Sequence, residues 1–267
     1  MRIRAYSLFY EDPALMELQR DSFACHVQDD DFQLVVIDNS RTEGGAGAIK
    51  WEAKRLGLEY QRPPKPDKEF DTWMSNAWGL NYAFRWHAKH DDLAILLHPD
   101  IFLLRPVNLA QMMGKNKLAG IFLNITRKLQ HDKHPGVIKK VDDGDPYPWP
   151  GLLFMANPLP DDREVCFGLV KNGDTGSYLA AYLLRHPELP CGHFSGMPLH
   201  SSMLFRAACN YGYKLGYDVY GNQFGKVAYS GLIENAFLHL SGASSNWSET
   251  MTQEAMRFCA RFVRALR

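Results

Sequence analysis

Two histidines and one aspartate stand beside apolar runs, where their side chains could together bind a metal ion. His98 and Asp100 follow the run Leu93–Leu97, and His239 lies within a second run, Ala236–Leu240. Burying a carboxylate beside so much hydrocarbon is costly unless a cation or strong donors compensate. Residues two apart on an extended chain project to the same side, so His98 and Asp100 could face one ion. Aspartate oxygen suits Mg²⁺ or Mn²⁺, and imidazole also binds divalent metals, so these residues predict a metal site.

The same residues also fit plainer roles. Asp100 could cap backbone amides in a turn that follows a strand, and a lone histidine such as His239 is usually a hydrogen-bonded core residue. The sequence leaves both interpretations open.

Two further acidic residues occupy positions where an α/β sheet places its ligands. Asp38 ends the run Gln33–Asp38 and precedes Asn39 and Ser40. An acidic residue after such a strand can accept hydrogen bonds from a nucleobase or a ribose, although Asp-Asn-Ser is equally typical of a turn. Asp174 precedes a helix predicted over Thr175–Arg185 and is well placed to be its N-cap.

Trp149 and Gly151 lie in a proline-rich stretch, Pro146–Gly151. An indole packs well against the C–H groups of a sugar face, and a glycine beside it lets the backbone approach closely. The two residues could therefore form an aromatic platform for a ligand. Packing of Trp149 in the core, next to a proline-rich turn, is the plain alternative.

Elements that alternate along the first hundred residues must position these side chains. Short apolar runs predict strands at Ile3–Tyr10, Gln33–Asp38 and Leu93–Leu97. Helical spacing predicts helices at Pro13–Val27, Ala46–Leu56 and Thr72–Lys89. This alternation is typical of βαβ units, so we expect an α/β fold with a mostly parallel central sheet flanked by helices.

The middle and the end of the chain are less regular. Strands predicted at Leu118–Leu123 and Leu152–Ala156 are separated by a polar segment, Thr126–Asp145, which is typical of a mobile loop. The tail, Glu249–Arg267, has an apolar stripe and four arginines among its last eleven residues, which predicts a basic amphipathic helix. Such a helix either packs on the domain or rests on an anionic membrane surface.

The composition argues against several classes of protein. Thirty basic and thirty acidic residues give a net charge of zero, so we expect no nucleic acid partner. The five cysteines include no Cys-x-x-Cys pair, so neither a disulfide framework nor a four-thiolate zinc site is expected. The sequence begins without the apolar stretch of a signal peptide and contains no apolar segment of about 18 residues, so we expect a soluble, cytoplasmic protein.

Three stretches together resemble the nucleotide-sugar-dependent glycosyltransferases of the GT-A fold, in particular the family-2-like enzymes. They are Val35–Ser40, Ser75–Asn81 and Ile95–Phe102, in this order along the chain. The resemblance implies a single GT-A-like domain over residues 1–267. Within it, residues 1–105 would form a nucleotide-binding half, residues 106–248 an acceptor-binding half, and residues 249–267 the C-terminal helix.

The resemblance also implies how a sugar donor would bind. Asp38, Asn76 and Asp100 would bind the nucleotide part of a UDP- or GDP-type donor. His98, Asp100 and His239 would hold the Mn²⁺ or Mg²⁺ ion that bridges its diphosphate. His98 replaces the first aspartate of the family's Asp-x-Asp motif, which removes a negative charge and shifts the preference of the site towards softer metals.

The acceptor side follows from the same resemblance. Trp149 and Gly151 would bind a glycan or lipid-linked acceptor, and Asp174 would be the catalytic base that deprotonates its hydroxyl group. General base catalysis of this kind contributes on the order of 10² to 10⁴ in rate.

Other classes of protein compete with this interpretation. The residue types of His98, Asp100 and His239 match the two-histidine, one-carboxylate triad of a non-haem Fe(II) oxygenase, although those enzymes use an antiparallel barrel. A nucleotidyltransferase on a similar sheet and a catalytically silent module that binds nucleotide sugars are the remaining alternatives.

Overall fold

Two sheets organise the protein, one in each of two units whose segments interleave along the sequence. The computed structural model describes residues 1–64, 72–124, 145–168, 175–198, 231–234 and 236–239. The first unit comprises residues 1–11, 29–98 and 109–194, and the second comprises residues 12–28, 99–108 and 195–267. Because the two units have separate sheets, each is described by itself.

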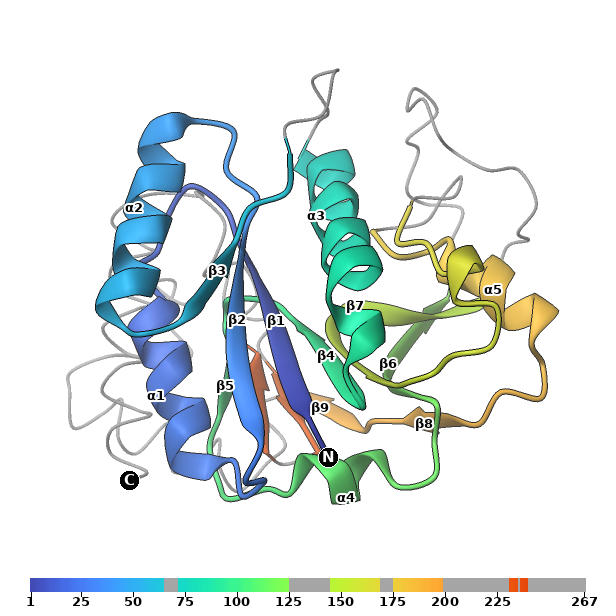
Figure 1. The fold of residues 1–267 in the computed structure, drawn as a ribbon. Coiled ribbons are helices and arrows are strands. Elements are labelled where there is room, and N and C mark those ends of the chain that lie inside the picture. Colours follow the sequence, from blue (N-terminus) through green and yellow to red (C-terminus); the bar gives the residue numbers. More distant parts are fainter. Residues whose placement is uncertain (65–71, 125–144, 169–174, 199–230, 235, 240–267) are drawn as a thin grey trace. The chain divides into compact units, whose positions relative to one another are not determined.

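The first unit contains a seven-stranded sheet with the strand order β3-β2-β1-β4-β7-β6-β8 (Figure 1). Its strands are β1 (Ile3–Phe9), β2 (Phe32–Asp38), β3 (Glu59–Gln61), β4 (Leu93–Leu97), β6 (Leu118–Asn124), β7 (Pro146–Ala156) and β8 (Cys191–His193). Four of its six strand pairings are parallel, and β7 pairs antiparallel with both β4 and β6. The expected α/β fold with a mostly parallel central sheet flanked by helices is confirmed.

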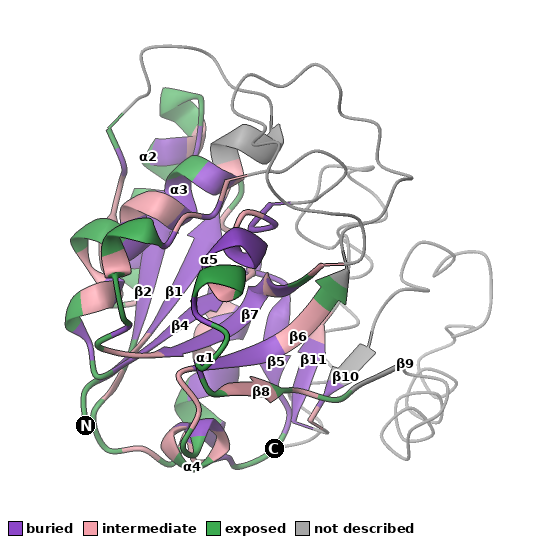
Figure 2. Cartoon of the chain, turned by 90° about the vertical axis from the view of Figure 1, so that its right-hand side faces the viewer, coloured by how far each residue is buried: buried purple, intermediate pink, exposed green. Residues whose placement is uncertain are grey.

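The central strands form where the sequence has uninterrupted apolar runs. All five residues of β4 are buried, as are the last five of β2 (Figure 2). A strand that is covered on both faces needs apolar side chains at every position, and these two runs supply them. The predicted strand Leu93–Leu97 agrees with β4, and the two other predicted N-terminal strands differ from β1 and β2 by one residue at one end.

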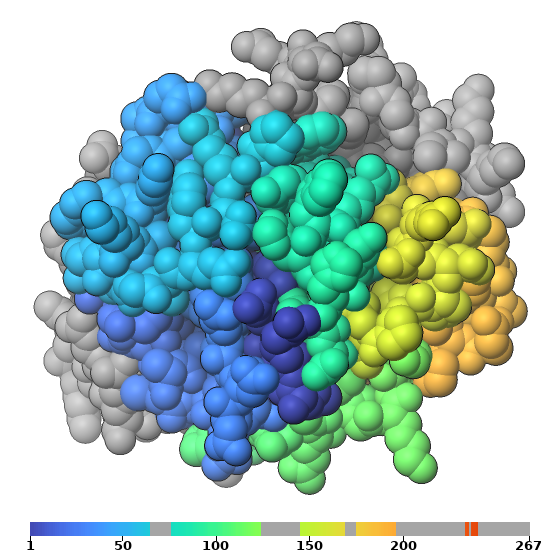
Figure 3. Space-filling view, in the orientation of Figure 1, coloured from blue at the N-terminus to red at the C-terminus, as the bar shows by residue number. Residues whose placement is uncertain are grey.

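The helices of this unit are α2 (Glu43–Arg55), α3 (Thr72–Trp86), α4 (Leu109–Met113) and α5 (Leu179–Arg185), with short 3₁₀ turns at Ala88–His90 and Asp162–Glu164. Leu80 and Phe84 of α3 and Tyr182 of α5 belong to one buried cluster together with β-strand residues such as Leu96. These two helices therefore cover the same face of the sheet. Side chains of α2, β3 and α3 form a continuous part of the surface seen in Figure 3.

Two elements of this unit differ from the prediction. Strand β7 begins at Pro146 rather than Leu152. The strand can contain Pro146, Pro148 and Pro150 because they alternate, so that their missing N–H groups all fall on one edge. That part of β7 pairs with β6 alone. Helix α5 begins at Leu179 rather than Thr175, because Gly176 has a φ of 85°, which is incompatible with a right-handed helix.

The second unit contains an antiparallel sheet that the sequence pattern did not predict. Its strand order is β5-β11-β10-β9, formed by β5 (Ile101–Leu103), β9 (Gly196–Pro198), β10 (Gly231–Ile233) and β11 (Phe237–His239). Helix α1 (Met16–His26) holds β5 in place, because the Gln19 side chain donates to the Ile101 carbonyl at 3.1 Å and the Ser22 hydroxyl accepts from the Leu103 N–H at 3.2 Å.

Some predicted features lie outside the described residues. They are the segment Thr126–Asp145 apart from its last residue, Asp174, and the C-terminal helix at 249–267. Their predictions, and the division at residues 105 and 248, stay predictions. Among the helices of the described part, each is too short or too polar to cross a membrane.

Truncating Leu96 should test the buried centre of the first unit. Leu96 is 0% exposed in the middle of β4, between β1 and β7. We expect Leu96→Ala to lower the free energy of unfolding by about 2–5 kcal/mol, through lost burial and a residual cavity. Urea denaturation measures this change, with Leu184→Ala as the control because Leu184 is 54% exposed. An equal effect of both substitutions would contradict the assignment of β4 to the core.

Candidate metal centre and sheet edge

The carboxyl ends of β2 and β4 lie at the same edge of the parallel sheet, on either side of β1. Asp38 pairs in register with Phe9 of β1, and Leu97, directly before His98, pairs with Ser7. The chain places β2 and β3 on one side of β1 and β4 on the other, so the order of the strands reverses between β1 and β4. Open α/β sheets bind their ligands at this point, outside the carboxyl ends of the strands.

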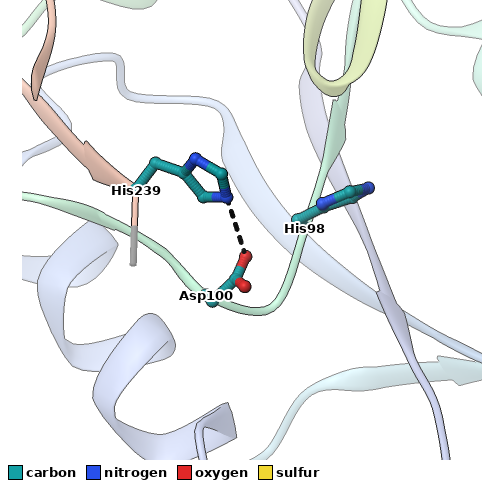
Figure 4. Close-up of side chains that lie close together, drawn as sticks. All are labelled: His98, Asp100 and His239. Carbon is teal, nitrogen blue, oxygen red and sulfur yellow. Dashed lines mark ion pairs between the residues drawn. The ribbon is translucent and has the colours of Figure 1, made fainter. Parts of the chain in front are cut away.

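Asp100 and His239 form an ion pair within the second unit. His239 closes β11 opposite Ile101 of β5, which brings its Nε2 atom to 3.7 Å from Oδ1 of Asp100 (Figure 4). The Asp100 side chain is only 3% exposed and that of His239 is 18% exposed. A carboxylate with so little access to water needs a cation or hydrogen-bond donors nearby to compensate for its burial.

His98 completes the cluster from the end of β4. Only Pro99 separates His98 from Asp100, so their proximity is a local property of the chain. One ligand atom of each of His98, Asp100 and His239 lies within 4.8 Å of the others. The three residues that the sequence singled out as metal ligands are therefore together.

The donor atoms of this cluster fit a divalent transition metal. Two atoms bound to one small divalent ion at about 2.1 Å are at most about 4.2 Å apart. The 3.7 Å between Asp100 and His239 is already within that limit. The widest separation, within 4.8 Å, must shrink by at most about 0.6 Å, which a side-chain rotation can supply. Two imidazoles and one carboxylate favour Mn²⁺, Fe²⁺ or Zn²⁺ over Mg²⁺, which prefers oxygen ligands.

Trp149 and Gly151 lie beside His98. The N–H of His98 donates to the carbonyl of Gly151 at 2.9 Å, and the rings of His98 and Trp149 meet edge to face with centroids 5.1 Å apart. The structure thus brings the predicted acceptor-binding residues next to one predicted metal ligand. Their role towards an acceptor stays a prediction.

Asp38 is buried and engaged by its own surroundings. Its Oδ1 accepts from the N–H of Ser40 at 2.9 Å, which is the turn that the sequence left open. Its Oδ2 accepts from the Tyr60 hydroxyl at 2.6 Å and lies 3.6 Å from Nε of Arg62. Burial, followed by the hydrogen bond and the charge of Asp38, raises the pKa of Tyr60 well above its usual value. Binding of a nucleoside by Asp38 stays a prediction, and it would have to share this carboxylate with Tyr60 and Arg62.

Asn76 lies half-buried on α3, one turn before Gly79. A Cβ atom at Gly79 would lie 3.2 Å from the side chain of Asn39, so the missing side chain lets α3 approach the residue that follows Asp38. Asn76 lies on the same helix, three residues before this close approach. Its contact with a donor stays a prediction.

Glu11 is a residue of this edge that the sequence analysis missed. Its carboxylate accepts from the N–H groups of Arg41 at 2.6 Å and Thr42 at 2.9 Å and from the Thr42 hydroxyl, at the N-terminus of α2. Its own N–H donates to Ser40 Oγ at 3.0 Å. Glu11 has a φ of 59°, and a Cβ at Gly45 would overlap its carboxylate. The sequence feature that could have identified Glu11 is its position as a charged residue directly after the first predicted strand, Ile3–Tyr10.

The hydrogen bonds to Glu11 stabilise its ionised form. Partial burial alone would raise the pKa of Glu11, but the donors from Thr42 and Arg41 outweigh burial and lower the pKa below its usual value. The N-terminal end of α2 acts in the same direction, because it favours negative charge. Glu11 thereby fixes the turn from Asn39 to Thr42.

No protein-family model matches the sequence, and the search of curated proteins found no match either. Among solved structures, the chain is similar to the mannosyltransferase PcManGT from Pyrobaculum calidifontis, determined in complex with GDP-Man and Mn²⁺. The identity is 11%, the alignment covers 99% of this chain and 74% of that chain, and the TM-score is 0.42. Likeness at this level carries no functional argument, so the function must be argued from the chain's own residues.

The fold and the cluster together define an α/β protein with a candidate site for a divalent metal.

We expect isothermal titration to detect binding of one Mn²⁺ or Zn²⁺ ion, with weaker binding of Mg²⁺ because two of the three ligands are imidazoles. Asp100→Asn should weaken Mn²⁺ binding by more than about 100-fold, since it removes the charged ligand. Asp30→Asn at an exposed position is the control. Equal Mn²⁺ affinities of the two variants would contradict this site.

The stability contributed by Glu11 should depend on pH. Because its pKa is lowered by folding, its contribution is complete above the ordinary glutamate value of 4.5 and is lost as the pH falls through the lower value of the folded protein. Glu11→Gln should therefore be less stable than the wild type at neutral pH, and the difference should disappear in acid. Urea denaturation at several pH values measures it. Glu17→Gln, at a side chain that is 45% exposed, is the control, and an equal pH dependence of both variants would contradict the role of Glu11.

Proposed function

We propose that the protein is a nucleotide-sugar-dependent glycosyltransferase of the GT-A type. It would move a sugar from a UDP- or GDP-type donor to the hydroxyl group of a glycan or lipid-linked acceptor. The observation that carries the proposal is the position of Asp38, which ends β2, and of His98, which directly follows β4. They lie on either side of β1 at the edge where the strand order reverses.

This position suits an extended, charged ligand. Strands in a sheet are about 4.8 Å apart, so residues at the ends of β2 and β4 are separated by about 10 Å across β1. A nucleoside at the Asp38 side and a diphosphate at the His98 side would span that distance. The partly exposed Tyr60 and Arg62, which contact the buried Asp38, add polar groups on the nucleoside side. Asn76, on the adjacent part of α3, is proposed to contact the same part of the donor.

His98, Asp100 and His239 are proposed to hold a divalent ion, with Mn²⁺ favoured over Mg²⁺ by the two imidazoles. The ion would supply positive charge that stabilises the leaving nucleoside diphosphate. The protein's own contribution is to hold the three side chains close to one another. The short segment from His98 to Asp100 and the pairing of β11 with β5 fix the three side chains before a donor binds.

Asp174 is proposed as the base that accepts the proton of the acceptor hydroxyl group. The residues on both sides of it are tied together, because Gly176 N–H donates to Phe167 O at 3.0 Å and Tyr178 N–H donates to Gly168 O at 3.1 Å. Gly176 also lies against Pro150, next to Trp149 and Gly151. The described residues that follow Asp174 in the sequence therefore lie beside Pro150, and the role of Asp174 itself is proposed from the sequence. A membrane contact of residues 249–267 would suit a lipid-linked acceptor and stays a prediction.

The Fe(II) oxygenase interpretation uses the same three ligands. Those enzymes hold the triad in an antiparallel barrel. Here β4, which leads to His98, belongs to a sheet with four parallel pairings, and the antiparallel sheet beside Asp100 and His239 has strands of only three residues each. The sheet therefore favours the transferase. A silent binding module differs from the transferase only in turnover, so product analysis separates the two.

A thermal-shift screen of UDP, GDP and their sugars, with and without Mn²⁺, tests the proposal. A donor at about 100 times its Kd stabilises the native state by about 2.7 kcal/mol, which raises the melting temperature by several degrees. We expect a shift that requires Mn²⁺ and is lost in Asp100→Asn. Asp174→Asn should keep the shift and lose transfer, because it leaves the donor site intact.

The products of the reaction distinguish the transferase from the alternative classes of enzyme. Release of pyrophosphate would identify a nucleotidyltransferase, and turnover of 2-oxoglutarate with Fe²⁺ would identify the oxygenase. A melting temperature unaffected by every nucleotide and nucleotide sugar would overturn the proposal, even if Mn²⁺ binds.

A further inference from the structure

Gly151 faces His98 across the ladder between β4 and β7. Leu97 pairs with Leu152, and one step further along the ladder the His98 N–H donates to the Gly151 carbonyl at 2.9 Å. Residues opposite each other in an antiparallel pair have side chains on the same face of the sheet. The space beside the His98 imidazole is therefore the space that a side chain at position 151 would occupy.

Trp149 fills that space. It lies two residues before Gly151 on β7. A Cβ atom at Gly151 would overlap the indole atoms Cζ2, Cη2 and Cε2 of Trp149. The indole thus folds over the bare backbone of Gly151 and reaches the imidazole of His98, with ring centroids 5.1 Å apart and an interplanar angle of 75°.

The segment that carries Trp149 is itself fixed. Gly176 has a φ of 85°, and a Cβ there would lie 2.9 Å from the ring carbons of Pro150. The Gly176 N–H donates to Phe167 O at 3.0 Å, and the Phe167 N–H donates to Oδ1 of Asn81 on α3 at 3.1 Å. A series of contacts therefore links α3 to Pro150, which is the residue between Trp149 and Gly151 in the sequence. These contacts give the indole a defined position relative to β4.

We infer that Trp149 and Gly151 position the imidazole of His98 for metal binding, and that Trp149 is not primarily a platform for an acceptor. This inference rests on the proposed metal centre. A histidine at the end of a strand can adopt several rotamers, and only some direct a ring nitrogen towards the ion shared with Asp100 and His239. The indole edge restricts these rotamers, and residues that orient a metal-bound histidine typically contribute 10- to 100-fold to metal affinity.

Removing the Trp149 side chain has different effects in its two possible roles. A positioning residue alters metal affinity whether or not an acceptor is present, whereas an acceptor platform alters the KM for the acceptor and leaves metal affinity unchanged. Gly151→Ala probes the same contact without touching the indole, because the added methyl group must displace it.

Titration of the full-length protein with Mn²⁺ alone, followed by calorimetry or by the electron paramagnetic resonance of free Mn²⁺, tests the inference. We expect Trp149→Ala and Gly151→Ala each to weaken Mn²⁺ binding by about 10- to 100-fold. Trp149→Phe keeps an aromatic edge and should stay within a few-fold of the wild type. Trp51→Ala is the matched control, because Trp51 is 65% exposed on α2 and should leave Mn²⁺ affinity unchanged.

A double-mutant cycle shows whether Trp149 acts through His98. In a His98→Ala background, Trp149→Ala should cause no further loss of Mn²⁺ affinity, because the ring that it orients is gone. Wild-type affinity of folded Trp149→Ala, or an equal loss in the His98→Ala background, would overturn the inference. Melting temperatures measured without metal show whether each variant folds. If Trp149→Ala does not fold, Trp149→Leu is used in its place. If Asp100→Asn also leaves Mn²⁺ affinity unchanged, the metal centre itself fails.

Discussion

The pairing of β11 with β5 is the constraint on which the candidate site depends. Asp100 is almost fully buried, and a buried carboxylate is stable only with compensating positive charge or donors. The register that places His239 opposite Ile101 brings an imidazole to that carboxylate from a segment far along the chain. Helix α1 holds the other side of β5 through Gln19 and Ser22. The second sheet is small, and its consequence for function is to join residues 100 and 239.

The first unit contributes the edge at which a ligand would bind. Its parallel strands end in polar residues, and those residues are already organised: Asp38 by Ser40, Tyr60 and Arg62, and Glu11 by the start of α2. Such preorganisation lowers the cost of binding, because the groups that meet a ligand need not be ordered when it arrives. The left-handed backbone of Glu11 indicates that the surrounding contacts hold this turn against local preference.

Glycines contribute to the geometry of the candidate site as much as the polar residues do, because they leave room for neighbouring groups. Gly79 lets α3 approach Asn39, Gly45 leaves room for the Glu11 carboxylate, and Gly151 leaves room for the Trp149 indole. At each position a Cβ atom would displace a group at this edge of the sheet. The geometry of the site therefore depends on three glycines that carry no chemistry of their own.

The sequence by itself determined the α/β class, the three main parallel strands and the identity of the three metal-ligand candidates, because uninterrupted apolar runs and the polar residues that end them are local signals. It did not determine the second sheet, whose strands have three residues each and leave no periodic pattern. Nor did it reveal Glu11, Tyr60 and Arg62, or the contact of Trp149 with His98. These depend on strand register and on close approach between segments distant in sequence, and only the tertiary structure decides such distances.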